Sequence, residues 1–290
     1  MTAPTTIESV TTRDGRGGET SVPALGLGTW QLRGGDAHDI VARALDVGYR
    51  HVDTAQMYGN EAEVGAAIAE SAVRRNDLFL TTKIDNSHRS RDAVRRSFDE
   101  SLAKLRTDHV DLLLLHWPTG DVKAALLAMA ELWEEGTARM IGVSNFTPTL
   151  LDEAMRTAPI SNLQVEHHPY LAQPTLLDLC RAKQVALTAY SPLARGAIAD
   201  DDVIRSIAAD HDATPAQVAL RWILDEGAIA IPKTSNPERL EENLGALRVR
   251  LTDDDRHRID ALDRVERLID PPSAPEWERT IDGHRTPREW

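Results

Sequence analysis

Eight short runs of β-branched and apolar residues recur along the chain, and segments with helical periodicity separate them. Strands that alternate with helices are typical of parallel sheets joined by helical crossovers, and eight such units predict a closed (β/α)8 barrel. An open doubly wound sheet is the alternative, and such a sheet more often has a second domain beside it. The expected strands are 24–30, 49–55, 78–84, 109–117, 140–146, 162–168, 186–192 and 228–234.

The two ends of the chain lie outside this alternation. Residues 1–23 contain a Gly-rich turn between two short β-like runs, which predicts a hairpin that closes the floor of the barrel. Residues 264–290 contain four prolines and no helical period, so we expect an extended tail that packs on the surface or reaches across the barrel mouth. No low-complexity linker interrupts the sequence, and 1–290 is therefore predicted to be a single domain.

Composition limits the classes of function. The 46 acidic and 33 basic residues give a net charge of −13, which argues against non-specific nucleic-acid binding and against binding to anionic membranes. Cys180 is the only cysteine, so an intrachain disulfide is impossible and a reducing compartment fits. Neither a secretory signal nor an apolar run of roughly 20 residues is visible. We expect a monomeric, cytoplasmic protein.

Four chemically capable side chains occur where three successive predicted strands end. Asp53 ends one strand and Tyr58 lies in the loop after it, while Lys83 and His116 end the next two. Each residue alone would more often be a cap, a packed ring or a solvated strand end. Barrel active sites are built at these strand ends, however, so the four together indicate one site.

These four residues suit acid catalysis by a phenol. A free tyrosine titrates near ~10, too high to donate a proton readily at neutral pH. We expect the Lys83 ammonium to lower the pKa of Tyr58, and Asp53 to keep Lys83 charged and in place. His116 could orient a substrate carbonyl by a hydrogen bond.

These residues suit protonation of a carbonyl oxygen as it becomes an alkoxide, and such a reaction also needs a reductant. A Rossmann site for a dinucleotide reductant is not supported, because no G-x-G-x-x-G follows a strand. The segment PKTSNPERLEENL instead offers Lys233, two hydroxyls and a helix start at Asn236 or Pro237 after the last strand. Helix N-termini in this part of a barrel often hold phosphate. Arg195 and Arg239 add positive charge, although Pro237 would also suit an ordinary helix start. Tyr190 could stack on a nicotinamide ring, and Ser144, Asn145 and Gln164 could bond its carboxamide.

The sequence resembles the aldo-keto reductase family over about residues 22–280, most closely its bacterial 2,5-diketo-D-gluconate reductase branch. The matching stretches, in the family's order, are GLGTW, DTAQMYGNE, TTKI, DLLLLHWP, IGVSNF, QVEHHPYL, AYSPLARG, TPAQVALRW and IPKTSNPERLEENL.

This resemblance implies an NADPH-dependent reductase of aldehydes, ketones or small dicarbonyls. It makes Tyr58 the general acid, Lys83 and Asp53 the pair that tunes its pKa, and His116 the residue that orients the carbonyl. Lys233, Ser235 and Arg239 would bind the 2′-phosphate, and Glu242 and Asn243 the adenine. The expected cofactor contacts are Ser144, Asn145, Gln164, Tyr190, Ser191, Leu193, Arg195, Lys233, Thr234, Ser235, Arg239, Glu242 and Asn243.

The chain departs from the family pattern around the substrate. Asp85 stands where relatives often have an aromatic wall, and Leu163 where they commonly have Asn. An acidic residue near the carbonyl would disfavour an anionic keto-sugar acid. The expected pocket residues are Trp30, Asp85, Trp117 and Trp277.

Two other functions fit parts of the sequence. A nucleotide-binding regulatory barrel with little turnover would keep the cofactor site, although the intact catalytic set argues against it. A metal-dependent hydrolase would use Asp53, His116, His167 and His168. Adjacent histidines on a strand point to opposite faces, however, so we expect no metal site.

Overall fold

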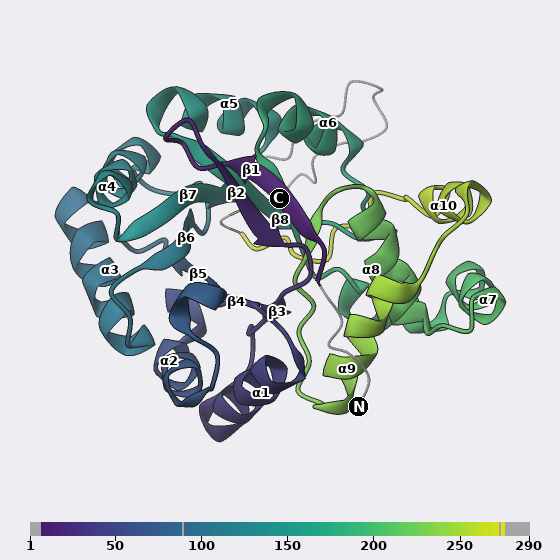
Figure 1. Cartoon of the computed structure of the whole chain (residues 1–290). Helices are drawn as coiled ribbons and strands as arrows, with labels where there is room; N and C mark the ends of the chain where they lie inside the picture. The colour runs from purple at the N-terminus through teal and green to yellow at the C-terminus, as the bar shows by residue number, and fades with distance from the viewer. Residues whose placement is uncertain (1–6, 89, 273, 276–290) are drawn as a thin grey trace.

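The computed structural model describes residues 7–88, 90–272 and 274–275. Its central feature is one sheet of eight parallel strands, in which each strand pairs with the next along the chain. A parallel bridge between Leu25 and Ala230 joins the first strand region to the last and closes the barrel, as predicted (Figure 1). The strands are β3 (Leu27–Gly28), β4 (His51–Asp53), β5 (Phe79–Ile84), β6 (Val110–Leu115), β7 (Ala138–Ser144), β8 (Ile160–Glu166), β9 (Ala186–Tyr190) and β10 (Ile229–Ala230).

All eight expected runs contain a strand, but the first and the last are much shorter than expected. The run 228–234 forms only the two residues of β10. Pro232 lies just beyond β10 and has no N–H to donate, so the ladder cannot continue through it. Its carbonyl still accepts a hydrogen bond from Gly28 N, 3.0 Å away, which keeps the barrel closed at this seam.

The helices surround the strands (Figure 1). In α3, Val94, Phe98 and Leu105 are buried, while Leu102 on the same face of the helix is half-buried. The α1 helix ends at Gly48, which adopts a left-handed φ of 115° as a C-cap. The helices are α1 (Gly34–Val47), α2 (Glu61–Glu70), α3 (Arg91–Leu105), α4 (Val122–Glu135), α5 (Pro148–Thr157), α6 (Pro174–Lys183), α7 (Asp202–Asp210), α8 (Pro215–Asp225), α9 (Glu238–Leu244) and α10 (Asp253–Asp260), with short 3-10 turns η1 (Gln56–Tyr58), η2 (Arg75–Asp77), η3 (Ala194–Asp200) and η4 (Gly245–Arg248).

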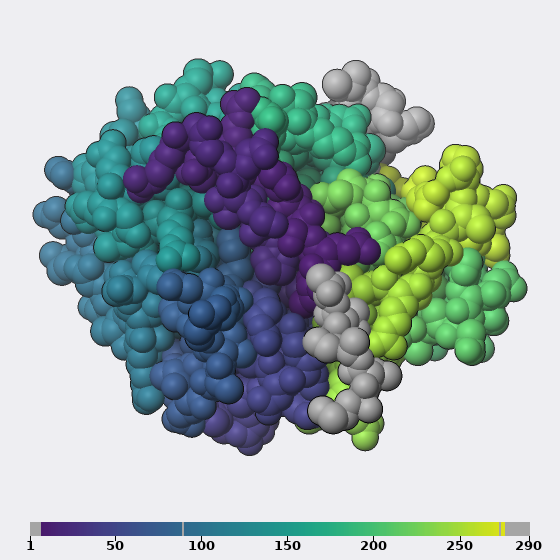
Figure 2. Space-filling model, viewed as in Figure 1, coloured from purple at the N-terminus to yellow at the C-terminus, as the bar shows by residue number. Residues whose placement is uncertain are grey.

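The N-terminal segment forms the predicted hairpin. Strands β1 (Ser9–Arg13) and β2 (Glu19–Pro23) pair antiparallel and lie across one end of the barrel (Figures 1 and 2). Thr12 Oγ1 donates a hydrogen bond to Ser161 O, 2.8 Å away at the start of β8, and Val22 is completely buried. The hairpin therefore covers the amino ends of the strands and leaves their carboxyl ends for a site.

The C-terminal segment is extended where the structure describes it. After α10 the chain runs back across the barrel (Figure 1), and Leu268 to Pro271 reach a cavity at the strand ends. No helix within the described ranges is long and apolar enough to cross a membrane.

Candidate active site

A cavity of about 470 Å³ opens at the carboxyl ends of the barrel strands. Five of its lining residues are the last or nearly the last residues of strands, namely Gly28, Asp53, Ser144, Gln164 and Tyr190, and the segments that follow the strands contribute the others. It is lined by Gly28, Thr29, Trp30, Asp53, Met57, Tyr58, Asn86, His116, Trp117, Ser144, Asn145, Gln164, Tyr190, Ser191, Arg195, Ile231, Lys233, Leu268, Ile269, Asp270 and Pro271.

Lys83 and Asp53 form a buried ion pair beside this cavity. Both come from neighbouring parallel strands, β5 and β4, and Lys83 Nζ lies 2.5 Å from Asp53 Oδ1. The ammonium also donates to Thr54 O at 2.8 Å and lies 3.4 Å from the hydroxyl oxygen of Tyr58. The structure thus brings together three of the four predicted catalytic residues through one ammonium group.

Tyr58 reaches this group from the short turn η1. Gly59 follows with a left-handed φ of 66°, which ends the turn and lets the chain enter α2. The Tyr58 ring lies 4.9 Å from the ring of Trp30 and 5.7 Å from that of His116, measured between centroids. His116, the fourth predicted catalytic residue, therefore lies beside the phenol.

Burial dominates the ionisation of these groups. It raises the pKa of Tyr58 well above the ordinary value, and the nearby Asp53 carboxylate raises it further. The net direction is therefore opposite to the lowering that we expected from Lys83 alone, because the cost of burying a phenolate outweighs the attraction of one cation. Burial likewise lowers the pKa of Lys83, against the opposing effect of Asp53. Burial and the charge of Lys83 lower the pKa of His116 to about 3, so its imidazole is neutral.

Gln164 takes up the second oxygen of the Asp53 carboxylate. Its side-chain Nε2 donates to Asp53 Oδ2 at 2.8 Å from across the barrel. The sequence suggested Gln164 as a carboxamide contact and gave no sign of this link. With Lys83 on one oxygen and Gln164 on the other, Asp53 has a fixed orientation.

Three further polar residues predicted to contact the cofactor form a hydrogen-bonded group. Asn145 adopts a left-handed φ of 64°, and its Nδ2 donates to Ser144 Oγ at 3.1 Å. The Tyr190 hydroxyl donates to Asn145 Oδ1 at 2.7 Å. Ser144 can still donate its hydroxyl proton, and Asn145 Oδ1 keeps a second lone pair, so the group can bond an amide.

The predicted phosphate-binding residues follow the last two strands, β9 and β10, and two of them, Arg195 and Lys233, line the cavity. Lys233, Ser235 and Arg239 are exposed, as is Arg195 on η3. None of these cations lies within 4.0 Å of a carboxylate in the described part of the chain. The helix expected from Asn236 or Pro237 begins at Glu238, one or two residues later.

Other predicted cofactor contacts are less accessible. Thr234 is buried, and its Oγ1 accepts a hydrogen bond from Asn236 N at 3.0 Å. Asn243 is 4% exposed and its side chain is hydrogen-bonded with Tyr49. Ser191, Leu193 and Glu242 are half-buried.

The predicted substrate residues divide into those that reach the cavity and those that do not. Trp30, which is 40% exposed, and the buried Trp117 line it. Asp85 does not, and this prediction is corrected: its carboxylate accepts a hydrogen bond from Ser87 N at 2.9 Å, and Asn86 lines the cavity instead. Trp277 lies outside the described residues.

The C-terminal segment supplies an apolar wall of the cavity, and the residues that form this wall were not predicted from the sequence. Leu268, Ile269 and Pro271 all line the cavity, together with Asp270. The sequence signal was an apolar pair just before two prolines, in a segment that has no helical or strand period. Such a signal shows an extended chain but not what it packs against.

The adjacent histidines have separate structural partners. His167 Nε2 lies 2.8 Å from Glu226 Oε2, and His168 Nε2 lies 3.0 Å from Glu166 Oε1. Each histidine therefore has its own carboxylate partner, and both lie just beyond the end of β8, where the alternation of a strand no longer applies. Within the ranges that the structure covers, no three His, Cys, Asp or Glu side chains are grouped to hold a metal ion.

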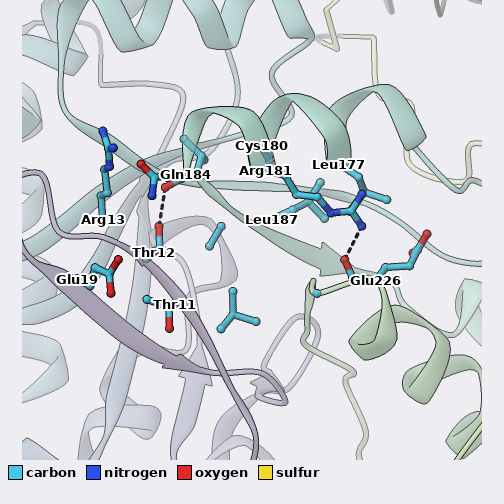
Figure 3. Close-up of a pocket in the computed structure, with 14 residues that line it drawn as sticks. Thr11, Thr12, Arg13, Glu19, Leu177, Cys180, Arg181, Gln184, Leu187 and Glu226 are labelled. Carbon is cyan, nitrogen blue, oxygen red and sulfur yellow. Dashed lines mark hydrogen bonds between the residues drawn. The ribbon is translucent and has the colours of Figure 1, made fainter.

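A second cavity, of about 340 Å³, lies at the floor of the barrel between the hairpin and α6 (Figure 3). Its polar groups hold the fold together: Thr12 Oγ1 donates to Gln184 O at 3.2 Å, and Arg181 Nη2 donates to Glu226 O at 2.7 Å. Cys180 lines it, but burial raises the pKa of this thiol to about 12, which leaves it unreactive. The mouth cavity is therefore the candidate active site.

A closed barrel whose mouth holds a phenol, a buried lysine–aspartate pair and a neutral histidine has the architecture of a barrel carbonyl reductase. The model of the aldo/keto reductase family matches residues 24–264. The chain belongs to this family, and it is an oxidoreductase that acts on carbonyl groups.

Several similar proteins match the 2,5-diketo-D-gluconate reductase branch of the family. The chain is 44% identical over 266 residues to methylglyoxal reductase DkgB of Escherichia coli O157:H7, covering 89% of this chain and 100% of the relative. It is 39% identical over 251 residues to glyoxal reductase of Bacillus subtilis, covering 85% and 91%. A solved structure assigned as 2,5-diketo-D-gluconic acid reductase B superposes with a TM-score of 0.90 at 42% identity, covering 95% of this chain and 99% of that one.

Proposed function

We propose that this protein reduces aldehydes, ketones or small dicarbonyls to alcohols with NADPH, and that Tyr58 is the general acid. The observation that carries the proposal is the buried chain of contacts from Asp53 through Lys83 to Tyr58, at the edge of a cavity of about 470 Å³. A cavity of this size suits a small carbonyl compound beside a nicotinamide ring. Relatives named methylglyoxal reductase and glyoxal reductase support small dicarbonyls as substrates.

The donor set suits NADPH. Ser144 and Asn145 can bond a carboxamide, and Tyr190 offers a ring face beside them. Lys233 and Arg239 are exposed without carboxylate partners among the described residues, so they can neutralise a 2′-phosphate. NADPH held by these residues would supply the hydride needed to reduce a carbonyl carbon.

The chain's own residues handle the oxygen and its proton. The neutral His116 imidazole lies beside Tyr58 and can donate a hydrogen bond that orients the carbonyl oxygen. Tyr58 is protonated at neutral pH, since even an unperturbed phenol titrates near ~10 and burial raises the pKa of this one further, and it can give that proton to the oxygen as negative charge develops there. Lys83, 3.4 Å from the phenol oxygen, stabilises the negative charge left on Tyr58.

The test is the oxidation of NADPH by the purified protein with methylglyoxal and with 4-nitrobenzaldehyde, repeated with NADH. We expect turnover with NADPH and a loss of at least about 100-fold in kcat for Tyr58→Phe, with the affinity for NADPH unchanged. Normal turnover by Tyr58→Phe would refute the role of the tyrosine. Tight NADPH binding without turnover on any carbonyl would favour the regulatory barrel instead.

A further inference from the structure

Glu166 is a buried carboxylate that the proposed reaction does not use. It is the last residue of β8 and is completely buried. Each of its oxygens accepts one backbone hydrogen bond from the C-terminal segment: Leu268 N donates to Oε1 at 2.8 Å, and Ile269 N donates to Oε2 at 3.0 Å. Two side chains complete its surroundings, His168 Nε2 at 3.0 Å and Arg267 Nη1 at 3.9 Å.

This arrangement makes the packing of Glu166 depend on the C-terminal segment. A carboxylate is costly to bury unless hydrogen bonds replace the water that it loses. Charge-assisted bonds to backbone N–H groups are among the stronger ones available. If the segment left, each oxygen of Glu166 would lose the backbone N–H group that donates to it, so the carboxylate holds the segment firmly.

The stretch 263–271, here called the strap, is fixed at its beginning by other contacts. Glu266 N donates to Tyr170 O at 2.9 Å, and the Arg264 guanidinium lies 3.8 Å from the centre of the Tyr170 ring. Val265 has a φ of 58°, a left-handed backbone conformation that is strained for a β-branched residue. These contacts attach the strap to the loop after β8 but do not direct it into the cavity.

Glu166 acts at the point where the strap enters the barrel mouth. The two residues whose N–H groups it binds, Leu268 and Ile269, also line the active-site cavity. Pro271, two residues further on, lines it as well. One carboxylate therefore fixes the backbone of an apolar wall in the same cavity as Trp30 and Trp117.

We propose that Glu166 is a positioning residue that sets this apolar wall, and that through the wall it selects carbonyl substrates with a larger apolar or aromatic substituent. This inference rests on the proposed function. A substrate such as methylglyoxal, which carries one methyl group, is too small to depend on the wall. An aromatic aldehyde needs it, because its ring must be packed while the carbonyl stays at Tyr58.

The test compares Glu166→Gln with Glu226→Gln as the matched control. Both residues pair with a buried histidine, but Glu226 lines the floor cavity and does not touch the strap. For Glu166→Gln we expect the KM for 4-nitrobenzaldehyde to rise about tenfold, while kcat and KM for methylglyoxal stay within about twofold. Hydrogen exchange at the Leu268 and Ile269 amides should quicken about tenfold or more. Glu226→Gln should change none of these.

A second variant changes the apolar wall and leaves Glu166 in place. Leu268→Ala should raise the KM for 4-nitrobenzaldehyde while the Ile269 amide stays slow to exchange. Added to Glu166→Gln, it should raise that KM little further, because both changes remove the same wall. An unchanged KM for the aromatic aldehyde in Glu166→Gln, or an equal loss on both substrates, would overturn the inference. Absence of NADPH-dependent turnover in the wild type would overturn the proposed function, and the inference with it.

Discussion

The ammonium of Lys83 lies 2.5 Å from the Asp53 carboxylate, and the two side chains are 0% and 2% exposed. Lys83 also donates to Thr54 O at 2.8 Å and lies 3.4 Å from the Tyr58 hydroxyl, so each of its three N–H bonds has an oxygen atom as its acceptor. Gln164 holds the other carboxylate oxygen. Asp53 therefore fixes the position of Lys83, and Lys83 presents a charge to Tyr58.

Removing either Asp53 or Lys83 alone should lower the free energy of unfolding more than removing both charges together. Asp53→Asn leaves the Lys83 ammonium buried without its counter-ion, and we expect the free energy of unfolding to fall by about 3–5 kcal/mol. The double variant Asp53→Asn/Lys83→Met should lose less than the sum of the two single changes, because no buried charge remains. Urea unfolding of the four proteins measures the coupling. Strict additivity would show that the pair does not interact in the folded protein.

The pH profile of carbonyl reduction should be flat around neutrality. Tyr58 donates a proton only when protonated, and its raised pKa keeps it so up to at least about pH 10. His116, with a pKa of about 3, stays neutral throughout the same range. We expect kcat/KM at saturating NADPH to show no ionisation between about pH 6 and 9. A limb near pH 6.5 that disappears in His116→Gln would contradict a neutral imidazole.

Cofactor preference should depend on the exposed cations after β10. Arg239→Met removes one charge from the site expected to hold the 2′-phosphate, and the KM for NADPH should rise about tenfold, equivalent to ~1.4 kcal/mol. The KM for NADH should change little, because NADH has no 2′-phosphate. Arg205→Met on α7, which removes an exposed arginine beside Asp202, is the matched control and should affect neither cofactor. An equal rise in KM for NADPH and NADH would show that Arg239 does not bind the 2′-phosphate.

Sequence reasoning located the groups that regular strands carry. Parallel strands in register bring their carboxyl ends to one edge, so Asp53 and Lys83 could be assigned to one site before their contact was known. The side-chain direction beyond a strand end was less certain. Asp85 follows β5 directly, yet its carboxylate accepts a hydrogen bond from Ser87 N and does not line the cavity, whereas Asn86 does.

The strap illustrates what a sequence pattern cannot supply. Leu268 binds Glu166 across a separation of 102 residues, and neither residue lies in a periodic pattern that points to the other. The burial of Lys83 and Tyr58 was likewise not visible in the sequence. Lys83 next to Tyr58 suggested a lowered phenol pKa, but the sequence did not show how deeply both groups are buried, and burial reverses the direction.

Acid stability should depend on Asp255, at the start of α10. Burial favours its protonated form, but hydrogen bonds from Thr252 and His211 prevail and lower its pKa to about 2, from an ordinary 3.8. A lowered pKa stabilises the fold above the unfolded value, near 3.8, and this contribution is lost as pH falls toward 2. We expect Asp255→Ala to lower the free energy of unfolding by about 1–2 kcal/mol at pH 7.

The deficit of Asp255→Ala relative to the wild type should shrink between about pH 4 and 2, because protonation removes the same interactions in the wild type. Asp253→Ala is the control, since the Asp253 side chain is 88% exposed and pairs with Arg256 on the surface. Urea unfolding at several pH values measures both. A deficit of constant size across this range would mean that Asp255 acts by packing and not by its charge.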